Sequence, residues 1–329
     1  MTSTPADPPT PVLLVHPGPH GVAVYARDIA AEVARHDAAT RVTTPAALET
    51  LPAGTPLHAH VTDRLWGSSP EEATRHVVAL AARHPLTLTL HDVPQASDGE
   101  RNRPRRQAFY RAAIEASRGV VVNSGHEREL LREEGVWSGE VGVIPLPVDA
   151  RPVTPGSSDD AIGVLGYFYP GKGHDEALAA AVASGMSRLT VLGRASEGHA
   201  TDLEAFVRRA AAVDVVVEVT GWLDDADMSA RVARVAVPVI AHRHVSASGS
   251  LASWIGWGRR PLAVRNRYVD EMATLRPGTL SVVEADDLAV AVAEARVDVG
   301  RTWHGVHPVP FGGAEAARAY LRWWSEVSA

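Results

Sequence analysis

Short apolar runs alternate with amphipathic segments along almost the whole chain, and no other feature of the sequence constrains the fold as strongly. A short apolar run bounded by turn residues is typical of a buried strand. Apolar residues at three- and four-residue spacing are typical of a helix that covers a sheet. Repeated strand–helix units build parallel sheets with helices on both faces. We therefore predict an α/β fold with doubly wound parallel sheets.

The expected elements fall into two series. In the first half, strands are expected at Pro11–His16, Thr40–Thr43, Leu57–Val61, Leu86–Leu90, Gly119–Asn123 and Gly142–Pro145. Helices between them are expected at Val22–Arg35, Glu71–Arg83, Arg105–Ala116 and His126–Glu134. In the second half, strands are expected at Ala161–Gly166, Leu189–Gly193, Val215–Thr220, Ala236–His242, Pro261–Val264 and Leu280–Val283. An amphipathic helix is expected near the end of the sequence, at Gly313–Val327.

A proline-rich segment, 145–159, separates the two series, and its prolines cannot continue a helix or a central strand. At roughly 150 residues per domain, the 329 residues correspond to about two domains. We therefore expect an N-terminal domain at 12–148, a linker at 149–160 and a C-terminal domain at 161–312. Residues 1–11, rich in Pro and Thr, are expected to form a disordered tail.

The composition excludes several classes of protein. The formal net charge of -7 argues against a surface that binds nucleic acid or anionic lipid. The sequence has no cysteine, which excludes disulfides, thiolate catalysis, zinc ribbons and iron–sulfur clusters. No apolar run reaches the ~18 residues of a membrane span, and the first residues lack the features of a signal peptide. We therefore expect a cytoplasmic protein without a transmembrane segment.

Ligands of open α/β sheets bind beyond the carboxyl ends of the strands, so the loops that follow the strands are the candidate sites. The segment 17–21, Pro-Gly-Pro-His-Gly, leads from the first strand into a helix, whose free N–H groups favour an anion. His91 and Asp92 follow the fourth expected strand, where an imidazole can hydrogen-bond to a bound sugar or acid. His58 and His60 alternate on the preceding strand and share one face, without a third ligand for a metal.

The second half contains two candidate anion sites. Lys172 is the single lysine among 32 Lys and Arg residues, and it lies between two glycines after a strand. A glycine-flanked ammonium at a strand-to-helix turn suits a diphosphate, which needs positive charge and backbone donors together. Ser248, Gly249 and Ser250 open a later helix and form the other candidate. The acidic segment 224–227 precedes a helix, and we interpret it as a helix cap rather than a metal site.

Five segments of the sequence together resemble one family of enzymes. They are Gly18-Pro-His-Gly21-Val, Thr89-Leu-His-Asp92, Val120-Val-Val-Asn-Ser124 with Glu127, Val143-Ile-Pro-Leu-Pro-Val-Asp149, and Gly166 to Lys172-Gly173 followed by Leu192-Gly193 and Val219-Thr220-Gly221. In their order and spacing they resemble the GT-B glycosyltransferases, in particular the retaining sugar-nucleotide enzymes of glycosyltransferase family four. The resemblance spans nearly the whole chain and implies two Rossmann-like domains that face a cleft.

The resemblance implies a nucleotide-diphospho-sugar donor held mainly by the C-terminal domain and an acceptor held mainly by the N-terminal domain. The acceptor would be a small molecule, a glycan or a lipid-linked sugar, and transfer would retain the anomeric configuration without a metal or another cofactor. The last helix, 313–329, would cross back onto the N-terminal domain. His91 and Asp92 would be the catalytic residues. The implied donor contacts are Gly21, Gly166, Lys172, Gly193, Arg194, Ser248, Gly249, Ser250 and Glu271. The implied acceptor-side residues are His20, His60 and Ser124.

The sequence departs from the family pattern in two places. Tyr167 stands where the family usually has an arginine before the lysine turn, so half of a diphosphate clamp is missing or supplied elsewhere. Three arginines are candidates for it: Arg194, Arg243 and Arg259. Val245 and Ser253 stand where the family commonly has two glutamates, and Glu271 is the residue that could replace them at the ribose.

Two alternatives to a glycosyltransferase stay open. The missing carboxylates motivate a catalytically degenerate GT-B protein that binds a sugar nucleotide or a partner without turnover. An isomerase on the same scaffold would need paired acid and base residues, for which His91 is the single candidate.

Overall fold

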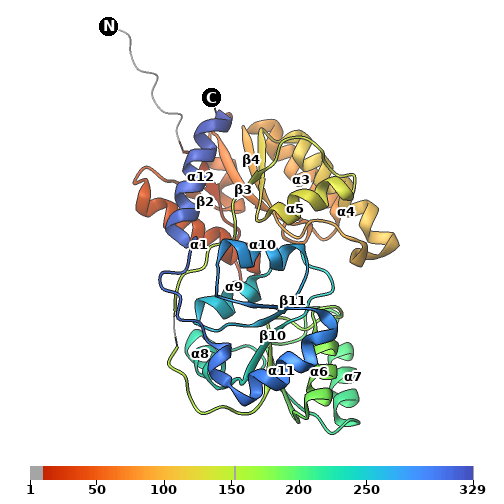
Figure 1. Cartoon of the computed structure of the whole chain (residues 1–329). Helices are drawn as coiled ribbons and strands as arrows, with labels where there is room; N and C mark the ends of the chain where they lie inside the picture. Colours follow the sequence, from red (N-terminus) through yellow and green to blue (C-terminus); the bar gives the residue numbers. More distant parts are fainter. Residues whose placement is uncertain (1–9, 152, 329) are drawn as a thin grey trace. The chain divides into compact units, whose positions relative to one another are not determined.

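The computed structural model describes residues 10–151 and 153–328, which form two compact units (Figure 1). Unit 1 comprises the described residues up to Pro147 together with those from Phe311 on, and unit 2 comprises Val148–Pro310. Each unit contains a six-stranded parallel sheet with helices packed against it. The predicted α/β class, with two Rossmann-like doubly wound domains, is therefore confirmed.

The sheet of unit 1 has the strand order β2-β1-β3-β4-β5-β6. Its strands are β1 (Val12–Leu14), β2 (Val42–Thr43), β3 (Leu57–Val61), β4 (Leu86–Leu90), β5 (Gly119–Val122) and β6 (Gly142–Val143). The central strands β3 and β4 pair along their whole length and are buried throughout. A strand that is covered on both faces is the easiest kind to locate from its apolar run, and the predicted bounds of β3 and β4 match the structure.

The helices of unit 1 form a layer on each face of this sheet. They are α1 (Gly21–His36), α2 (Asp63–Trp66), α3 (Pro70–Arg83), α4 (Gly99–Ala116), α5 (Gly125–Glu133) and α12 (Gly313–Ser328), with the 3-10 turns η1 (Pro45–Thr50) and η2 (Ala96–Asp98). Val12 and Leu14 of β1 pack in a core with side chains of α3 and α4, whereas Leu13 packs with side chains of α1 and α12. Successive residues of a strand point to opposite faces, which explains this division. The C-terminal helix α12 lies against α1 (Figure 1).

The sheet of unit 2 has the strand order β12-β11-β10-β7-β8-β9. Its strands are β7 (Ile162–Leu165), β8 (Arg188–Leu192), β9 (Val216–Val219), β10 (Val237–Ile240), β11 (Leu262–Val264) and β12 (Ser281–Val283). Its helices are α6 (His174–Ser184), α7 (Ala200–Ala211), α8 (Asp225–Arg234), α9 (Gly249–Gly256), α10 (Arg267–Leu275) and α11 (Leu288–Val297), with the 3-10 turns η3 (Ala285–Asp287) and η4 (Val299–Thr302). Parallel strands end at one common edge, so the loops after β7, β8 and β10 gather there.

Several predicted strand ends differ from the structure by one or two residues, as at β1 and β10, and the differences at β6 and α4 involve proline. α4 begins at Gly99 rather than Arg105, because the helix contains Pro104 instead of starting after it. A proline within a helix has no N–H for the carbonyl four residues earlier, yet α4 continues through Pro104 to Ala116. β6 ends at Val143 rather than Pro145, because Pro145 has no N–H to donate to the ladder.

Candidate functional site

At the carboxyl edge of the unit 1 sheet, polar side chains from three adjacent strands are hydrogen-bonded to one another. His91 directly follows β4 and is only 6% exposed. Its Nε2 lies 3.1 Å from Nδ1 of His60, which belongs to β3. Its Nδ1 lies 3.2 Å from the side-chain nitrogen of Asn123, which follows β5. The predicted residues His60 and His91 are therefore in direct contact, and Asn123 is a member of this network that the sequence analysis did not single out.

The same face of the sheet carries a second set of buried polar contacts. Nδ1 and Nε2 of His58 each lie 3.0 Å from a threonine hydroxyl of β4, on Thr87 and Thr89 respectively. The hydroxyl of Thr89 lies 2.9 Å from that of Tyr320 on α12, and Tyr320 lies 3.4 Å from the hydroxyl of Tyr25 on α1. These contacts connect the central strands to the two helices that cover them.

Burial keeps the three histidines of this region neutral. It lowers the pKa of His91 to about 3, with a smaller effect from His20. It likewise lowers the pKa of His58 to about 3, with His91 as the second cause. The pKa of His60 is held well below its usual range by burial and by the two neighbouring imidazoles. At neutral pH each ring therefore carries a single proton and both donates and accepts hydrogen bonds.

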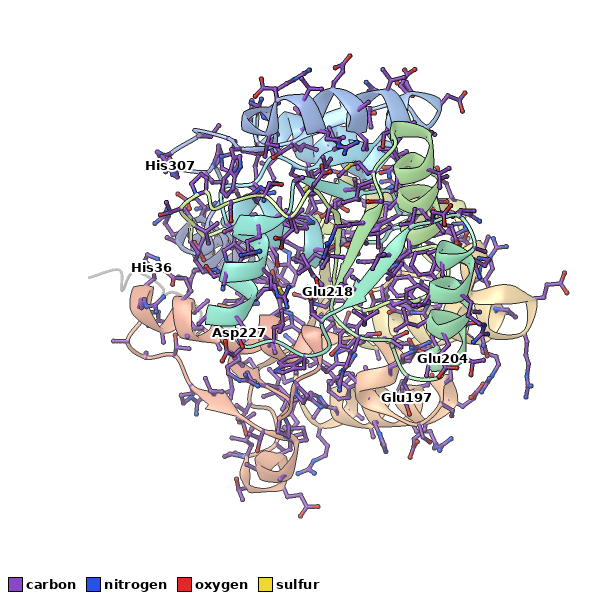
Figure 2. The ribbon with its side chains drawn as sticks, turned by 90° about the horizontal axis from the view of Figure 1, so that it is seen from below. His36, Glu197, Glu204, Glu218, Asp227 and His307 are labelled. Atoms are coloured by element: carbon purple, nitrogen blue, oxygen red, sulfur yellow. The ribbon has the colours of Figure 1, made fainter. Side chains whose placement is uncertain are left out.

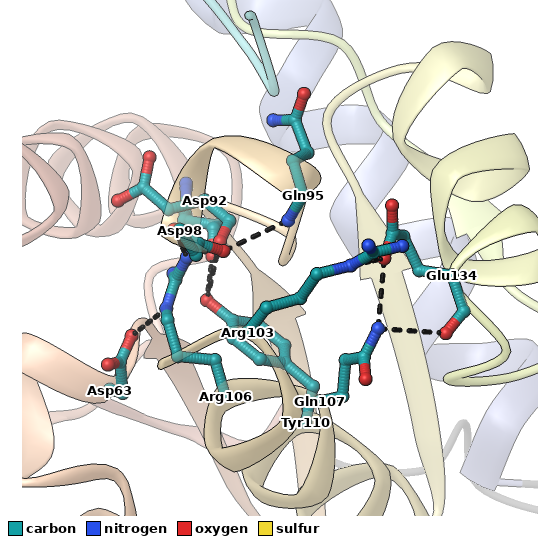
Figure 3. A network of polar contacts seen from close by, with 10 residues as sticks. Asp63, Asp92, Gln95, Asp98, Arg103, Arg106, Gln107, Tyr110 and Glu134 are labelled. Atoms are coloured by element: carbon teal, nitrogen blue, oxygen red, sulfur yellow. Dashed lines mark hydrogen bonds and ion pairs between the residues drawn. The ribbon is translucent and has the colours of Figure 1, made fainter. Parts of the chain in front are cut away.

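Asp92 has a different environment from His91. Its side chain is exposed, and its backbone adopts a left-handed φ of 52°. The Asp92 carbonyl accepts hydrogen bonds from Arg106 at 2.6 Å and from the hydroxyl of Tyr110 at 3.1 Å. Arg106 is held in turn by Asp63 at 3.0 Å and Asp98 at 2.6 Å (Figure 3). Two α4 side chains thus fix the strained turn and leave the Asp92 carboxylate at the surface.

The remaining predicted residues of unit 1 are parts of helix N-termini. His20 caps α1, with its Nδ1 accepting a hydrogen bond from the Val22 N–H at 3.2 Å. Gly21 is the exposed first residue of that helix. Ser124 caps α5 through the Glu127 N–H at 3.0 Å and is fully buried. A contact between Ser124 and an acceptor would therefore require this cap to open.

In unit 2, the structure brings the predicted lysine and serines together. Lys172 follows β7, is 8% exposed, and donates a hydrogen bond from Nζ to the Ser250 hydroxyl at 3.1 Å. The Ser250 and Ser248 hydroxyls are 3.1 Å apart, and Ser248 caps α9. Gly249 is the exposed first residue of α9. The ammonium also lies 5.7 Å from the ring centre of Tyr169, a cation–π distance.

Two loop glycines are required by close backbone contacts. A Cβ on Gly173 would lie 2.7 Å from the carbonyl of Ala241, and its φ is 102°. A Cβ on Gly193 would lie 2.2 Å from the carbonyl oxygen of Gly166. The loops after β7, β8 and β10 therefore touch through their main chains. The predicted site residues of unit 2 from these loops form one cluster.

Two buried histidines beside Lys172 were not identified from the sequence. His174 is the first residue of α6, and His242 follows β10. Burial lowers the pKa of His174 to about 3, with Lys172 as the second cause. Burial, Lys172 and His174 together hold the pKa of His242 well below its usual range. Both imidazoles are therefore neutral, and Lys172 supplies positive charge to the cluster. The only sequence signal for them was their place beside predicted loops.

The three arginines proposed for the clamp have different environments. Arg259 is wrong as a candidate, because it is 0% exposed and its guanidinium donates to the carbonyls of Val232, Ala236 and Thr302. Arg243 is exposed and paired with Glu176. Among the described residues, no carboxylate pairs with Arg194.

The guanidinium of Arg194 lies near two exposed aromatic rings. Its centre is 5.7 Å from the ring of Tyr167 and 5.9 Å from the ring of Trp222. Trp222 is 67% exposed. Glu271, the last predicted donor contact, is half-buried on α10. The same helix carries Tyr268, whose hydroxyl accepts from the Ser248 N–H at 3.0 Å.

The acidic segment 224–227 acts as a helix cap, as predicted. The Asp224 carboxylate accepts a hydrogen bond from the Asp227 N–H at 2.8 Å. Asp227 lies in the first turn of α8 (Figure 2). Within residues 10–151 and 153–328, no group of three or more His, Asp or Glu side chains is arranged to hold a metal ion. Nor does this part of the chain contain a helix of sufficient length and apolar character to span a membrane.

Comparison with solved structures finds proteins of the same fold. A search of protein-family models finds no match, and a search of curated proteins finds none either. The Anabaena protein HepE, solved in complex with UDP, is 15% identical over 97% of this chain and 96% of its own, with a TM-score of 0.63. A sucrose-phosphate synthase from Thermosynechococcus elongatus is 15% identical over 97% of this chain and 96% of its own, with a TM-score of 0.66. The pneumococcal O-GlcNAc transferase GtfA, in complex with UDP and GlcNAc, is 13% identical over 86% of this chain and 58% of its own, with a TM-score of 0.57. The chain shares their fold.

Proposed function

We propose that this chain is a glycosyltransferase that transfers a sugar from a nucleotide-diphospho-sugar to an acceptor, with retention of configuration and without a metal. The observation that carries the proposal is the cluster around Lys172, which combines an ammonium, two serine hydroxyls and glycine loops at the carboxyl edge of the unit 2 sheet. The shared fold supports it, because HepE and GtfA were both solved with UDP.

The chemistry of the cluster suits a departing diphosphate. When the bond between the sugar and the diphosphate breaks, negative charge develops on the phosphate oxygens. A fixed ammonium and preorganised N–H and O–H donors stabilise that charge more than they stabilise the intact donor. Lys172 supplies the ammonium, and the first residues of α6 and α9 supply free N–H groups. We assign the donor diphosphate to this cluster.

The aromatic surface around Arg194 is suited to the base of the nucleotide. Trp222 and Tyr167 offer exposed rings, and Arg194 adds a cation without a paired carboxylate among the described residues. Stacking of a base on an aromatic ring contributes about 1–3 kcal/mol and tolerates different bases. We therefore propose that this surface contributes affinity for the nucleotide rather than strict selectivity for one base.

Unit 1 supplies neutral hydrogen-bonding groups in this proposal. A neutral imidazole such as that of His60 can hydrogen-bond to a sugar hydroxyl without introducing charge, and the exposed Asp92 carboxylate is available to accept a proton. Val245 is buried and Ser253 bears no carboxylate, which favours the degenerate sugar-nucleotide-binding protein as the second candidate function. Turnover of a sugar nucleotide distinguishes a glycosyltransferase from this binding protein.

The test measures release of the nucleoside diphosphate from a panel of UDP-, GDP-, ADP- and dTDP-sugars. We expect release with one member of the panel, and at least a hundredfold slower release in Lys172→Met, since loss of a preorganised charge donor typically costs ~10²–10³ in rate. The control is Arg188→Met, which removes a cation from the opposite end of the same sheet, at the start of β8. Binding of a sugar nucleotide without release would select the degenerate protein instead.

A further inference from the structure

The hydrogen bonds of Asn123 fix the orientation of its side-chain amide. Its Nδ2 lies 3.3 Å from the carbonyl oxygen of Leu90 and 3.2 Å from Nδ1 of His91. A carbonyl oxygen only accepts, so the amide nitrogen and not the amide oxygen must face Leu90. The same nitrogen then donates its second proton to His91.

This orientation determines which nitrogen of His91 carries the proton. Because Nδ1 of His91 accepts from Asn123, the proton of the neutral ring lies on Nε2. Nε2 is 3.1 Å from Nδ1 of His60, so His91 donates and His60 accepts. The proton of His60 therefore lies on its own Nε2. Within the described residues, that Nε2–H makes no hydrogen bond.

The chain of donors thus has a single direction, from Asn123 through His91 to His60. Both ring nitrogens of His91 are used inside the protein, whereas His60 has one N–H left. The ring centre of Tyr25 lies 5.2 Å from that of His60 and 5.3 Å from that of His91, both in edge-to-face geometry, and these contacts restrict both imidazoles. The titratable side chains near the pair are His58, His20, Tyr25 and Tyr320.

We propose that His60 Nε2–H is the donor that unit 1 presents to an oxygen of the bound sugar or acceptor, and that Asn123 and His91 are positioning residues that keep the proton on that nitrogen. The ligand role rests on the proposed function, whereas the direction of the proton chain does not. His91 was expected to be able to hydrogen-bond to a bound sugar, but both of its ring nitrogens already have partners within the protein, whereas Nε2 of His60 has none among the described residues.

The test determines which ring nitrogen of His60 and of His91 carries the proton. Two-bond ¹H–¹⁵N correlation spectra of the full chain, labelled on histidine and recorded at pH 7, distinguish the Nδ1–H and Nε2–H forms. We expect the Nε2–H form for both His60 and His91. Two internal standards exist: His84 must be Nδ1–H because that nitrogen faces the Thr55 carbonyl at 3.1 Å, and His304 must be Nε2–H because that nitrogen faces the Ile255 carbonyl at 2.8 Å.

The variant Asn123→Asp moves the proton of His91 from Nε2 to Nδ1, because a carboxylate accepts a hydrogen bond from Nδ1 and cannot donate one to it. We expect His91 to lose the Nε2–H form and His60 to lose it as well, while His84 and His304 are unchanged. An unaltered His60 in Asn123→Asp, or an Nδ1–H form in the wild type, overturns the proton chain. Neither measurement involves a nucleotide, so failure of the proposed function would be seen separately, as the absence of turnover.

The ligand role has its own measurement. With the nucleotide sugar that the wild type turns over, we expect the Nε2 resonance of His60 to shift on titration and that of His84 to stay. We also expect Asn123→Asp to raise KM about tenfold, the effect of one lost hydrogen bond to a bound ligand, with a smaller change in kcat. If the titration shifts the ring-nitrogen resonances of His91 and leaves those of His60 unchanged, the ligand contacts His91 and the proposal is overturned.

Discussion

Arg259 and Arg194 show how differently two arginines of one unit are used. The guanidinium of Arg259 is buried and donates to three backbone carbonyls, and burial lowers its pKa to about 9. We expect Arg259→Met to lower the free energy of unfolding by about 2–4 kcal/mol, because it leaves buried carbonyls without donors.

We expect the matched change Arg194→Met to alter stability by less than about 0.5 kcal/mol, as an exposed substitution does. Its effect should instead appear as weaker binding of a nucleoside diphosphate. Urea denaturation and calorimetric titration of both variants check this. Equal loss of stability in the two variants would contradict the distinction. Nothing in the sequence distinguishes the two residues, because Arg259 is buried against the carbonyls of Val232, Ala236 and Thr302, which are remote from it along the chain.

The elements were largely predictable, and the contacts between their ends were not. Alternating apolar runs located the strands of both sheets, because strands buried on both faces carry a strong local signal. The start of α4 was missed because Pro104 is tolerated within it. His174 and His242 were missed because their proximity to Lys172 arises only when the loops after β7 and β10 meet.

The turn between β7 and α6 gives a prediction at this scale. A side chain on Gly173 meets the Ala241 backbone and requires a φ of 102°, so we expect Gly173→Ala to lower stability by about 3 kcal/mol or more. Gly198→Ala is the matched control, with a φ of 82° and no atom within 4 Å of the added Cβ, and should cost about 1 kcal/mol. Urea denaturation measures both, and similar losses would show that the contact with Ala241 is unimportant.

For the whole chain, buried neutral histidines predict a loss of stability in acid. The folded pKa values of His58, His91 and His174 are about 3, because all three rings are buried. An unfolded histidine titrates near 6.5, so the unfolded chain binds more protons below that pH. The stabilising contribution is complete above pH ~6.5 and is lost as pH falls toward 3.

We expect each of these histidines to contribute a loss of about 1 kcal/mol per pH unit over this range. Urea denaturation between pH 7.5 and 5.0 measures how the free energy of unfolding depends on pH. His58→Gln should reduce this dependence, whereas His36→Gln, at an exposed position, should not. A stability that is constant from pH 7.5 to 5.0 would contradict neutral burial of the cluster.

Binding of a nucleoside diphosphate to the Lys172 cluster is the central claim, and thermal unfolding with UDP, GDP, ADP and dTDP tests it most directly. A ligand that binds the folded state alone at ~100 times its Kd adds ~2.7 kcal/mol of stability. We predict that one diphosphate raises the unfolding temperature of the wild type and of Arg188→Met, and leaves Lys172→Met unchanged. An equal rise in Lys172→Met, or no rise with any of the four on folded wild type, would contradict the account.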